Sequence, residues 1–264
     1  MNIRSLLDQP REILEQFSRD KAKYAYLGNH LGLVTVLGKF RTYVDTRDVS
    51  VAPHLIMDGC WEPWVTMALR RVPRGAFAVD IGANHGYFSL LLAEITERTV
   101  LAFEPQEHLA RLISRSAKVN GLKIEVREEG VGSQIGSGEL VYAENQYNFG
   151  TVNLEHHAEL SDDDNFVRVV DLDSCLGMAP DFIKIDAEGS EHEIWAGMSN
   201  ILAKRPTILM EFTPHLYPDA EGFLKDIQSC YPLREVSPQG EIEPISASKI
   251  LEHEEFVMLW LEKE

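Results

Sequence analysis

The sequence predicts an α/β fold in which a doubly wound, mostly parallel sheet carries helices on both faces. From residue 77 to residue 212, short apolar runs alternate with amphipathic stretches of helical spacing, as expected for successive βαβ units. Glycine and ionisable residues gather directly after the predicted strands. In an open α/β sheet that edge holds the ligand, so the same pattern predicts the fold and the place of a binding site.

Residues 1–74 precede this alternation and are predicted to form a cap beside the sheet, while residues 75–264 form the main domain. The expected cap elements are a helix over 11–26, strands over 33–37 and 41–44 around a turn, and a helix over 61–72. A break at 73–75 leads into the first core strand. So short a piece is not expected to fold independently.

Each core element has its own signal: β-branched apolar runs for strands, and apolar residues three and four apart for helices. In order, we expect strand 77–81, helix 86–97, strand 99–103, helix 107–119, strands 124–127, 138–143 and 166–172, strand 181–185, helix 191–204, strand 207–212, helix 219–230, and strands 233–236 and 256–261 as one antiparallel hairpin. The polar stretch 145–165 lacks periodicity and is predicted to be a loop.

The stretch VDIGANHGYF, from Val79 to Phe88, marks the first strand–turn–helix unit. Gly82 and Gly86 bracket a tight turn where a side chain would block close approach of a ligand. The pattern is close to the dinucleotide fingerprint G-x-G-x-x-G, but Asn84 stands where the second glycine would admit a pyrophosphate. The turn therefore suits a cofactor with a nucleoside and no phosphates, such as S-adenosylmethionine (SAM).

An acid follows this turn at the distance that ribose binding requires. Glu104 ends the second core strand, about 20 residues beyond the turn, where a carboxylate can accept hydrogen bonds from both ribose hydroxyls. Pro105 stops the strand and joins the candidate cofactor contacts. Val131, after the third strand, and Phe88 are further candidates, although aromatic residues at helical spacing, such as Phe88, Trp61 and Trp64, are more often part of the core.

The stretch DFIKIDAEGSE at 181–191 is the second strong signal. Asp186 and Glu188 come after an apolar strand and before a helix, so both are expected to face the cleft as cofactor contacts, substrate-orienting groups or proton acceptors. Glu191 lies in the first turn of that helix and is more simply explained by the helix dipole. Lys184, inside a buried strand, is expected to reach an edge or to pair with an acid.

His215 follows the fifth core strand and suits a general base, because an unperturbed imidazole titrates near neutrality. An ordinary surface histidine beside a proline turn explains it equally well. Asp186, Glu211 and His215 also offer the oxygen and nitrogen ligands of a metal site, but nothing in the sequence fixes their geometry. We therefore predict no metal, and we take Asp186, His215 and Glu188 as the catalytic candidates.

The composition disfavours several classes of function. The chain carries 42 acidic and 25 basic residues, a net charge of −17, which argues against nucleic acid and anionic membrane surfaces as partners. Three cysteines lie far apart without metal-ligand spacing, which fits a reducing compartment. Because no signal peptide or membrane span is visible, we expect a cytoplasmic protein. We expect its partner to be a small molecule. The sequence leaves a homo-oligomer open.

The joint pattern resembles the FkbM-type family of SAM-dependent methyltransferases. The residues that carry the resemblance are VDIGANHGYFSLLLA at 79–93, AFEP at 102–105 and DFIKIDAEGSE at 181–191. Asp171-Leu172-Asp173 also looks like the family pattern before its fourth strand. The run Gly59-Cys60-Trp61-Glu62 looks like its Gly-aromatic-Glu approach, one residue longer than usual. The resemblance covers roughly residues 59–213.

This resemblance implies a class I, Rossmann-like sheet of seven strands and methyl transfer from SAM, commonly onto oxygen. Acceptors in such a family come from secondary metabolism, saccharides or lipids. Carried over by motif, the methionine part of SAM would lie along Asp80, Gly82, Asn84 and Gly86, the ribose at Glu104, the adenine along the turn 130–132, and the methyl group and acceptor at Asp186 and Glu188.

The leading hypothesis is SAM-dependent O-methylation of a small-molecule hydroxyl, with Asp186 or His215 as the base. A carboxylate acceptor would need no base. One alternative is an NAD(P)-dependent oxidoreductase, against which Asn84 in the turn argues. The other is a non-catalytic SAM-binding module, in which the loop 145–165 would be a partner surface.

Overall fold

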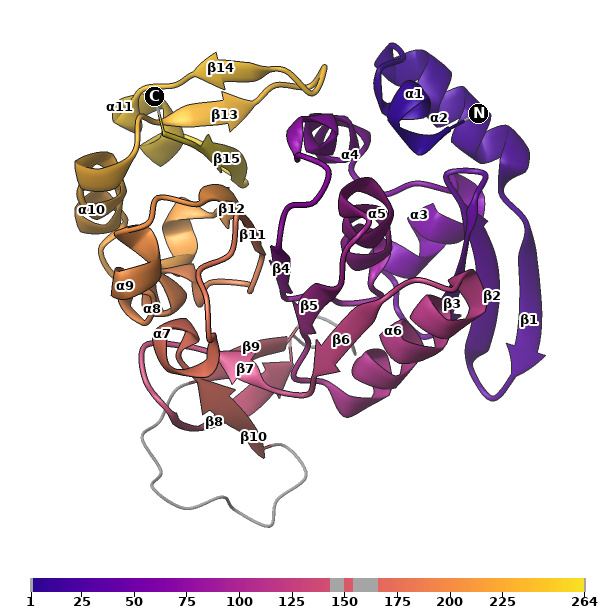
Figure 1. The fold of residues 1–264 in the computed structure, drawn as a ribbon, viewed down its shortest axis with the longest axis horizontal. Coiled ribbons are helices and arrows are strands. Elements are labelled where there is room, and N and C mark those ends of the chain that lie inside the picture. Colours follow the sequence, from indigo (N-terminus) through magenta and orange to yellow (C-terminus); the bar gives the residue numbers. More distant parts are fainter. Residues whose placement is uncertain (1, 143–149, 154–165, 264) are drawn as a thin grey trace.

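The computed structural model describes residues 2–142, 150–153 and 166–263 (Figure 1). Its central sheet has eight strands in the order β14-β13-β15-β12-β11-β4-β5-β6. Their bounds are β4 (Ala78–Ile81), β5 (Val100–Phe103), β6 (Ile124–Arg127), β11 (Phe182–Ile185), β12 (Thr207–Phe212), β13 (Arg234–Val236), β14 (Ile242–Pro244) and β15 (Val257–Leu261).

The sheet confirms the predicted α/β class with mostly parallel strands. Strands β6, β5, β4, β11 and β12 pair in parallel, and β15 runs antiparallel between β12 and β13. The family resemblance implies seven strands, whereas this sheet has eight, with β14 as an additional strand at the edge. The predicted antiparallel pairing of the last two strands is confirmed as β13 and β15. They are not joined as a simple hairpin, because β13 turns back into β14 through Gly240, at φ +71°, before the chain reaches β15.

Helices cover both faces of this sheet (Figure 1). The helices α5 (Tyr87–Thr96) and α6 (Glu107–Asn120) lie on one face, and α8 (Glu191–Ala196), α9 (Ser199–Leu202), α10 (Ala220–Cys230) and α11 (Ala247–Leu251) lie on the other. Successive strand residues alternate between two hydrophobic cores, as a period of two requires: Ala78 and Phe182 join the first core, and Val79 and Ile183 join the second.

The order of the strands reverses between β4 and β11. From β4 the chain continues to β5 and β6 on one side, whereas β11 and β12 lie on the other side. Loops that leave the carboxyl ends of these two strands therefore diverge, and the crevice between them is where open α/β sheets bind ligands. This places the segments after residues 81 and 185 beside each other.

The N-terminal cap is more strand-rich than the sequence predicts. It contains α1 (Ile3–Leu7), α2 (Arg11–Lys21), β1 (Tyr24–Gly28), β2 (Leu31–Val36), β3 (Phe40–Asp45), α3 (Val51–Met57), α4 (Pro63–Ala68) and the 3₁₀ turn η1 (Leu69–Arg71). The predicted hairpin is confirmed as β2 and β3. The helix predicted to reach residue 26 instead ends at Lys21, because residues 24–28 pair with β2.

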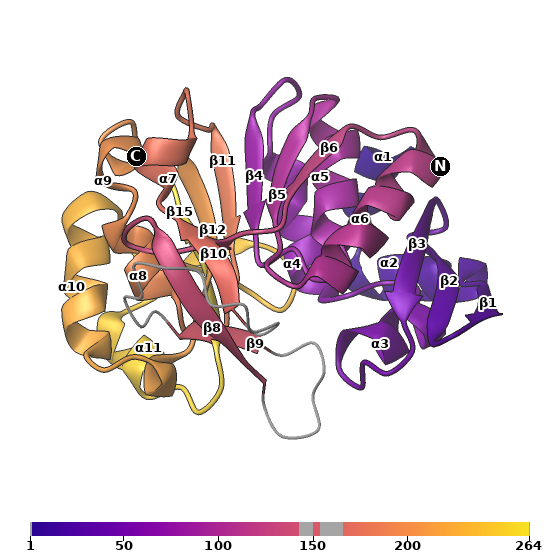
Figure 2. The same cartoon turned by 90° about the horizontal axis from the view of Figure 1, so that it is seen from below.

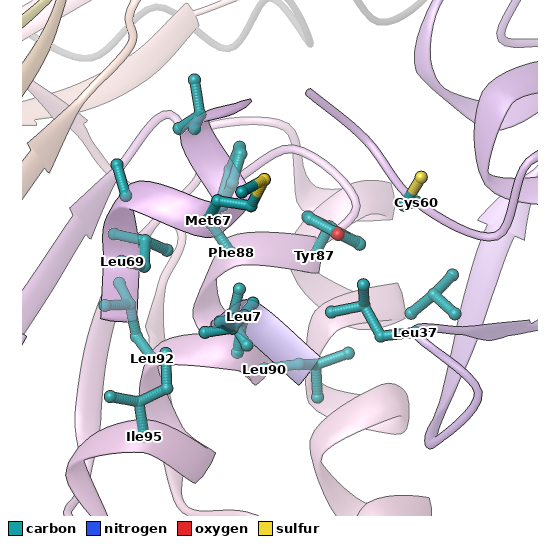
Figure 3. Close-up of a cluster of buried hydrophobic side chains, with 14 of the residues drawn as sticks. Leu7, Leu37, Cys60, Met67, Leu69, Tyr87, Phe88, Leu90, Leu92 and Ile95 are labelled. Atoms are coloured by element: carbon teal, nitrogen blue, oxygen red, sulfur yellow. The ribbon is translucent and has the colours of Figure 1, made fainter. Parts of the chain in front are cut away.

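The cap and the main domain share one hydrophobic core. Figure 3 shows Leu7 of α1 and Met67 of α4 in the same cluster of buried side chains as Phe88, Leu90 and Leu92 of α5. Figure 2 shows the sheet β1–β3 beyond α6, and the Tyr43 amide donates to Ser116 Oγ of that helix at 2.9 Å. The division of the chain at residue 74 therefore stays a prediction, since side chains from both sides of it pack together in one core.

A second small sheet follows β6, in the order β7-β10-β8-β9. Its strands are β7 (Gly130–Val131), β8 (Gly136–Tyr142), β9 (Gly150–Asn153) and β10 (Phe166–Val170), and the short helix α7 (Leu172–Cys175) comes next. The predicted loop 145–165 contains β9, and its remaining residues lie outside the described ones. Across the described helices, none has the length and apolar character needed to cross a bilayer.

We expect Leu7→Ala to lower the free energy of unfolding by about 2–5 kcal/mol, because it removes a fully buried side chain from the shared core. The matched control is Ile13→Ala on α2, whose side chain is 50% exposed and should cost no more than about 0.5 kcal/mol. Urea unfolding measures both values. A Leu7→Ala variant as stable as the control would mean that the cap is not part of the cooperative core.

Candidate active site

A cavity of about 840 Å³ opens at the carboxyl edge of β4 and β11. Its walls come from the cap, the turns after β4 and β5, the segment after β11, the end of β12, the small sheet that contains β7 and β8, and residues 254–256. The volume falls within the range of about 300–1,000 Å³ that is usual for small-molecule sites. The crevice predicted from the strand order is therefore a real cavity.

Gly82 is required where the turn after β4 meets the segment after β11. Its φ is +73°, and a Cβ atom added there would lie 1.7 Å from the carbonyl oxygen of Asp186. The two loops thus touch through backbone alone, and any side chain at 82 would force them apart. Gly86, at φ +78°, does not line the cavity; it begins α5, and a Cβ atom there would crowd Ile113 of α6 at 3.0 Å.

Glu104 is held in place by two backbone amides. The Asn84 amide donates to its Oε2 at 2.7 Å and the Gln106 amide donates to its Oε1 at 3.0 Å. Burial raises the pKa of Glu104 to about 7, and the two amide hydrogen bonds oppose that rise. Each carboxylate oxygen keeps a further lone pair, so a fixed pair of acceptors faces the cavity beside Pro105.

His85 links the cap to the same turn, a role that sequence reasoning missed. Its Nε2 accepts the Asp45 amide at 3.2 Å, and its Nδ1 lies 2.6 Å from Asn84 Oδ1. Because Nε2 accepts, the neutral ring carries its proton on Nδ1 and donates it to Asn84. Burial lowers the pKa of His85 to about 4, so the ring is neutral at pH 7. Only the folded cap brings Asp45 here.

Lys184 pairs with acids, as one of the two sequence interpretations expects. Its side chain is almost fully buried, and its Nζ lies 2.8 Å from Asp186 Oδ2, 3.9 Å from Asp80 Oδ1 and 4.9 Å from the centre of the Phe88 ring. Burial works against the charge, but Asp186 and Asp80 outweigh it and raise the pKa of Lys184. Asp80 lies beneath the cavity lining, where it also accepts Ser89 Oγ at 2.5 Å.

Three further carboxyl groups surround Asp186 in the cavity. Glu62 comes from the cap, Glu188 from the segment after β11, and Glu211 from β12. Burial, followed by the negative charge of Asp186, raises their pKa values to about 8, 9 and 10 respectively. Glu62 is the strongest addition from the structure, since it lies directly before α4 in a left-handed conformation, at φ +39°, and its buried side chain lines the cavity.

The remaining candidate residues lie on the cavity wall or directly behind it. His215, on the 3₁₀ turn η2 (Pro214–Leu216), is exposed and lines the cavity. Val131 lies in β7 on the cavity wall. Glu191 is structural, as expected, because it accepts the Ala187 and Gly189 amides and the Tyr217 hydroxyl. The cavity lining includes Gly82, Asn84, Phe88, Glu104, Pro105, Val131, Asp186, Glu188 and His215, whereas Asp80 and Gly86 support it from outside.

The metal alternative finds no geometric support in the part of the chain described here, which holds no group of three or more His, Cys, Asp or Glu side chains arranged to bind an ion. The Lys184 ammonium occupies the place beside Asp186 where a cation would be expected. The residues present instead suit a nucleoside ligand. SAM fits three features of the site. These are the narrow turn at Gly82, the Glu104 carboxylate that could accept hydrogen bonds from the two ribose hydroxyls, and the acidic groups near the strand ends.

A comparison with known families finds the methyltransferase FkbM domain over residues 80–233. No curated protein matches the chain. Among solved structures, the methyltransferase FkbM from Methylobacillus flagellatus is similar at 18% identity and a TM-score of 0.49, over 72% of this chain and 44% of that one. The 16S rRNA N2 G1207 methyltransferase of T. thermophilus, solved with AdoMet and guanosine, matches at 14% identity and a TM-score of 0.44, over 92% of this chain and 50% of that one.

A precorrin-6y C5,15-methyltransferase from Geobacter metallireducens is similar at 12% identity and a TM-score of 0.41, over 73% of this chain and 84% of that one. The present chain spans half or less of the length of the first two structures.

The raised pKa values of the acidic cluster predict that stability falls as pH rises. Protons held by Glu62, Glu188 and Glu211 in the folded state are bound less tightly after unfolding, where a glutamate titrates near 4.5. The contribution of these three groups to the free energy of unfolding is therefore complete below about pH 4.5, and it is lost as pH rises through about 8–10. The melting temperature, recorded between about pH 6 and pH 9, measures this fall. The charge of Asp186 raises the pKa of all three glutamates, whereas the charge of Lys184 lowers the pKa of Glu62 and Glu188.

Glu211→Gln should melt higher than the unchanged protein at about pH 9 and should show a smaller decrease from pH 6. The expected gain is about 2–4 °C for each kcal/mol of repulsion removed. Glu243→Gln, on the exposed edge strand β14, removes the same charge far from the cavity and should leave the pH dependence unchanged. Equal slopes for Glu211→Gln and the unchanged protein would contradict the cluster.

Proposed function

This chain belongs to the methyltransferase FkbM domain family, and on that premise we propose that it is a SAM-dependent methyltransferase that acts on a small-molecule hydroxyl. The observation that carries the proposal is the fixed Glu104 carboxylate beside the side-chain-free turn at Gly82. These two features form one wall of a cavity whose volume can hold a cofactor and a small acceptor together.

Each part of the wall has a proposed partner in SAM. Glu104 would hold the ribose, the turn at Gly82 and Asn84 would lie along the methionine part, and Val131 and Pro105 would lie beside the adenine. Asp80 supports this arrangement indirectly through Lys184. The ring of Phe88 lies on the cavity wall and also faces the Lys184 ammonium, so it belongs to both the site and the core.

The chemistry asked of the protein is modest. SAM, when bound, supplies a methyl group on a positively charged sulfur. The chain must hold the acceptor oxygen in line with the carbon–sulfur bond, so that the carbon–oxygen bond forms as that bond breaks. Such orientation contributes about 7–11 kcal/mol. The hydroxyl proton would pass to Asp186 or His215, both on the cavity wall, with Glu188 facing the acceptor.

The oxidoreductase alternative receives no support from the turn. A dinucleotide pyrophosphate needs free backbone amides at the start of the helix, but the Asn84 amide already donates to Glu104. A small acceptor, rather than nucleic acid, is proposed because the chain carries a net charge of −17 and the cavity wall holds several carboxyl groups.

Glu104→Gln should weaken SAM binding by roughly 10–100-fold. Its amide group would set an N–H donor against one of the two backbone donors, Asn84 or Gln106, and leave that donor unsatisfied. Titration calorimetry with SAM measures the change. Glu107→Gln, an exposed change near the start of α6, is the control and should bind as the unchanged protein does. SAM affinity within about twofold of normal in Glu104→Gln would refute the ribose assignment.

Replacing the base should reduce kcat by about 10²–10⁴-fold and flatten its pH profile. We expect one of Asp186→Asn and His215→Ala to show this loss, while the other stays within roughly tenfold of normal. His30→Asn, at an exposed position in the turn between β1 and β2 and outside the cavity lining, controls for loss of an imidazole. Methyl transfer from radiolabelled SAM to an identified acceptor provides the rates. If both variants turn over normally, orientation alone explains the catalysis.

A further inference from the structure

The acceptor side of the cavity holds more carboxyl groups than its own cations balance. Glu62, Glu188 and Glu211 surround Asp186 there, and Lys184 is the only lysine or arginine among the described residues that line the cavity. Lys184 is already shared by Asp186 and Asp80. The surplus of carboxyl groups is therefore built into the wall, and their raised pKa values mean that these groups hold protons at neutral pH and can give them up to an incoming cation.

Glu62 gives this cluster the character of a binding site. The residue is only 7% exposed, and within the described structure its Oε2 has no hydrogen-bond partner although it lines the cavity. A buried carboxyl oxygen without a partner carries a desolvation penalty of about 1–3 kcal/mol. A ligand that donates hydrogen bonds and brings positive charge would remove this penalty, whereas an apolar or anionic group would increase it.

The cluster lies on the acceptor side of the proposed cofactor. Glu211 belongs to β12 and Glu104 follows β5, with β11 and β4 between them. Three strand spacings correspond to about 14 Å. In SAM the sulfur is attached directly to the ribose C5′ carbon, so a ribose held at Glu104 keeps the sulfur within a few bonds of that strand. Glu211 is therefore placed beyond the transferred methyl group.

The register of the sheet also supports the placement of Glu211, because it puts Glu211 on the same face as Lys184. Lys184 lies opposite Leu209 of β12 and Asp80 of β4 in the parallel register, and Glu211 shares the face of Leu209 because side chains two apart point the same way. Lys184 and Glu211 thus face the cap, which contributes Glu62. The exposed Glu254 and Glu255 add two further carboxyl groups to the cavity wall.

We propose that the methyl acceptor carries a cationic amine close to its reacting hydroxyl, and that Glu62, Glu188 and Glu211 bind this amine. The inference rests on the proposed function and adds the chemical class of the substrate. An ammonium group offers three donors, which matches carboxyl groups arriving from three separate elements. Hydrogen bonds between an ammonium and carboxylates are among the stronger ones in proteins, and they would set the hydroxyl in one orientation.

A test uses 4-amino-1-butanol and its N-acetyl derivative, which keep the same hydroxyl but differ in charge. The protein is first loaded with S-adenosylhomocysteine, so that no turnover occurs, and each probe is titrated by calorimetry. We expect the amine to bind at least about tenfold more tightly than the amide. Binding of the amine should also release protons from the cluster, which two buffers of different ionisation enthalpy will reveal.

Glu62→Gln and Glu211→Gln should each reduce amine affinity by about tenfold or more and leave the amide unaffected. Glu243→Gln on the exposed edge strand serves as the control and should bind both probes normally. Melting curves establish that the variants are folded. An amine that binds no better than the amide, that is insensitive to both variants, or that displaces S-adenosylhomocysteine would overturn the inference.

The two hypotheses fail in different ways. A protein that binds neither SAM nor S-adenosylhomocysteine would refute the proposed function. A protein that binds SAM and transfers its methyl group to neutral hydroxyl compounds as readily as to amino alcohols would refute the amine inference alone. With an acceptor in hand, the free amine should show a kcat/KM at least about tenfold above that of its N-acetyl form.

Discussion

The buried ammonium of Lys184 is the interaction on which the site depends. It lies opposite Asp80 in the register of β4 and β11 and reaches Asp186 at 2.8 Å. Both strands end at the cavity, so this ion pair joins the two halves of the sheet where the strand order reverses. Removing one partner of a buried pair leaves a charge without compensation, at a cost of about 3–5 kcal/mol. The lysine therefore fixes the spacing and the charge of the crevice together.

The close approach of two backbone segments, together with the ion pair, fixes the geometry of the crevice. Because Gly82 has no side chain, the carbonyl of Asp186 can lie against the turn after β4, and the cofactor wall and the acceptor wall become one unit. The cap is attached to the same unit twice. His85 connects Asp45 to Asn84, and Glu62 enters the cavity from the start of α4. A displacement of the cap would consequently alter both walls.

Much of this could be read from the chain. The alternation of elements predicts the parallel sheet, and Gly82, Glu104 and Asp186 are placed correctly at its carboxyl edge because ligand-binding turns follow strands in this fold. Asp80 and Gly86 show the limit of motif reasoning. Both belong to the same motif as Gly82, yet one supports Lys184 from below and the other makes room for Ile113. Spacing identifies a turn, but it does not say which of its residues face the ligand.

The sequence alone determined the fold class, the glycine turn and the order of the strand-end acids, because these depend on local periodicity and short-range backbone geometry. Only the tertiary structure decided that Lys184 lies between Asp80 and Asp186, that residues 24–28 form a strand, and that Glu62 and Glu211 share one cavity. Those contacts join residues far apart in the chain. They arise from strand order and from packing of the cap, which no local pattern encodes.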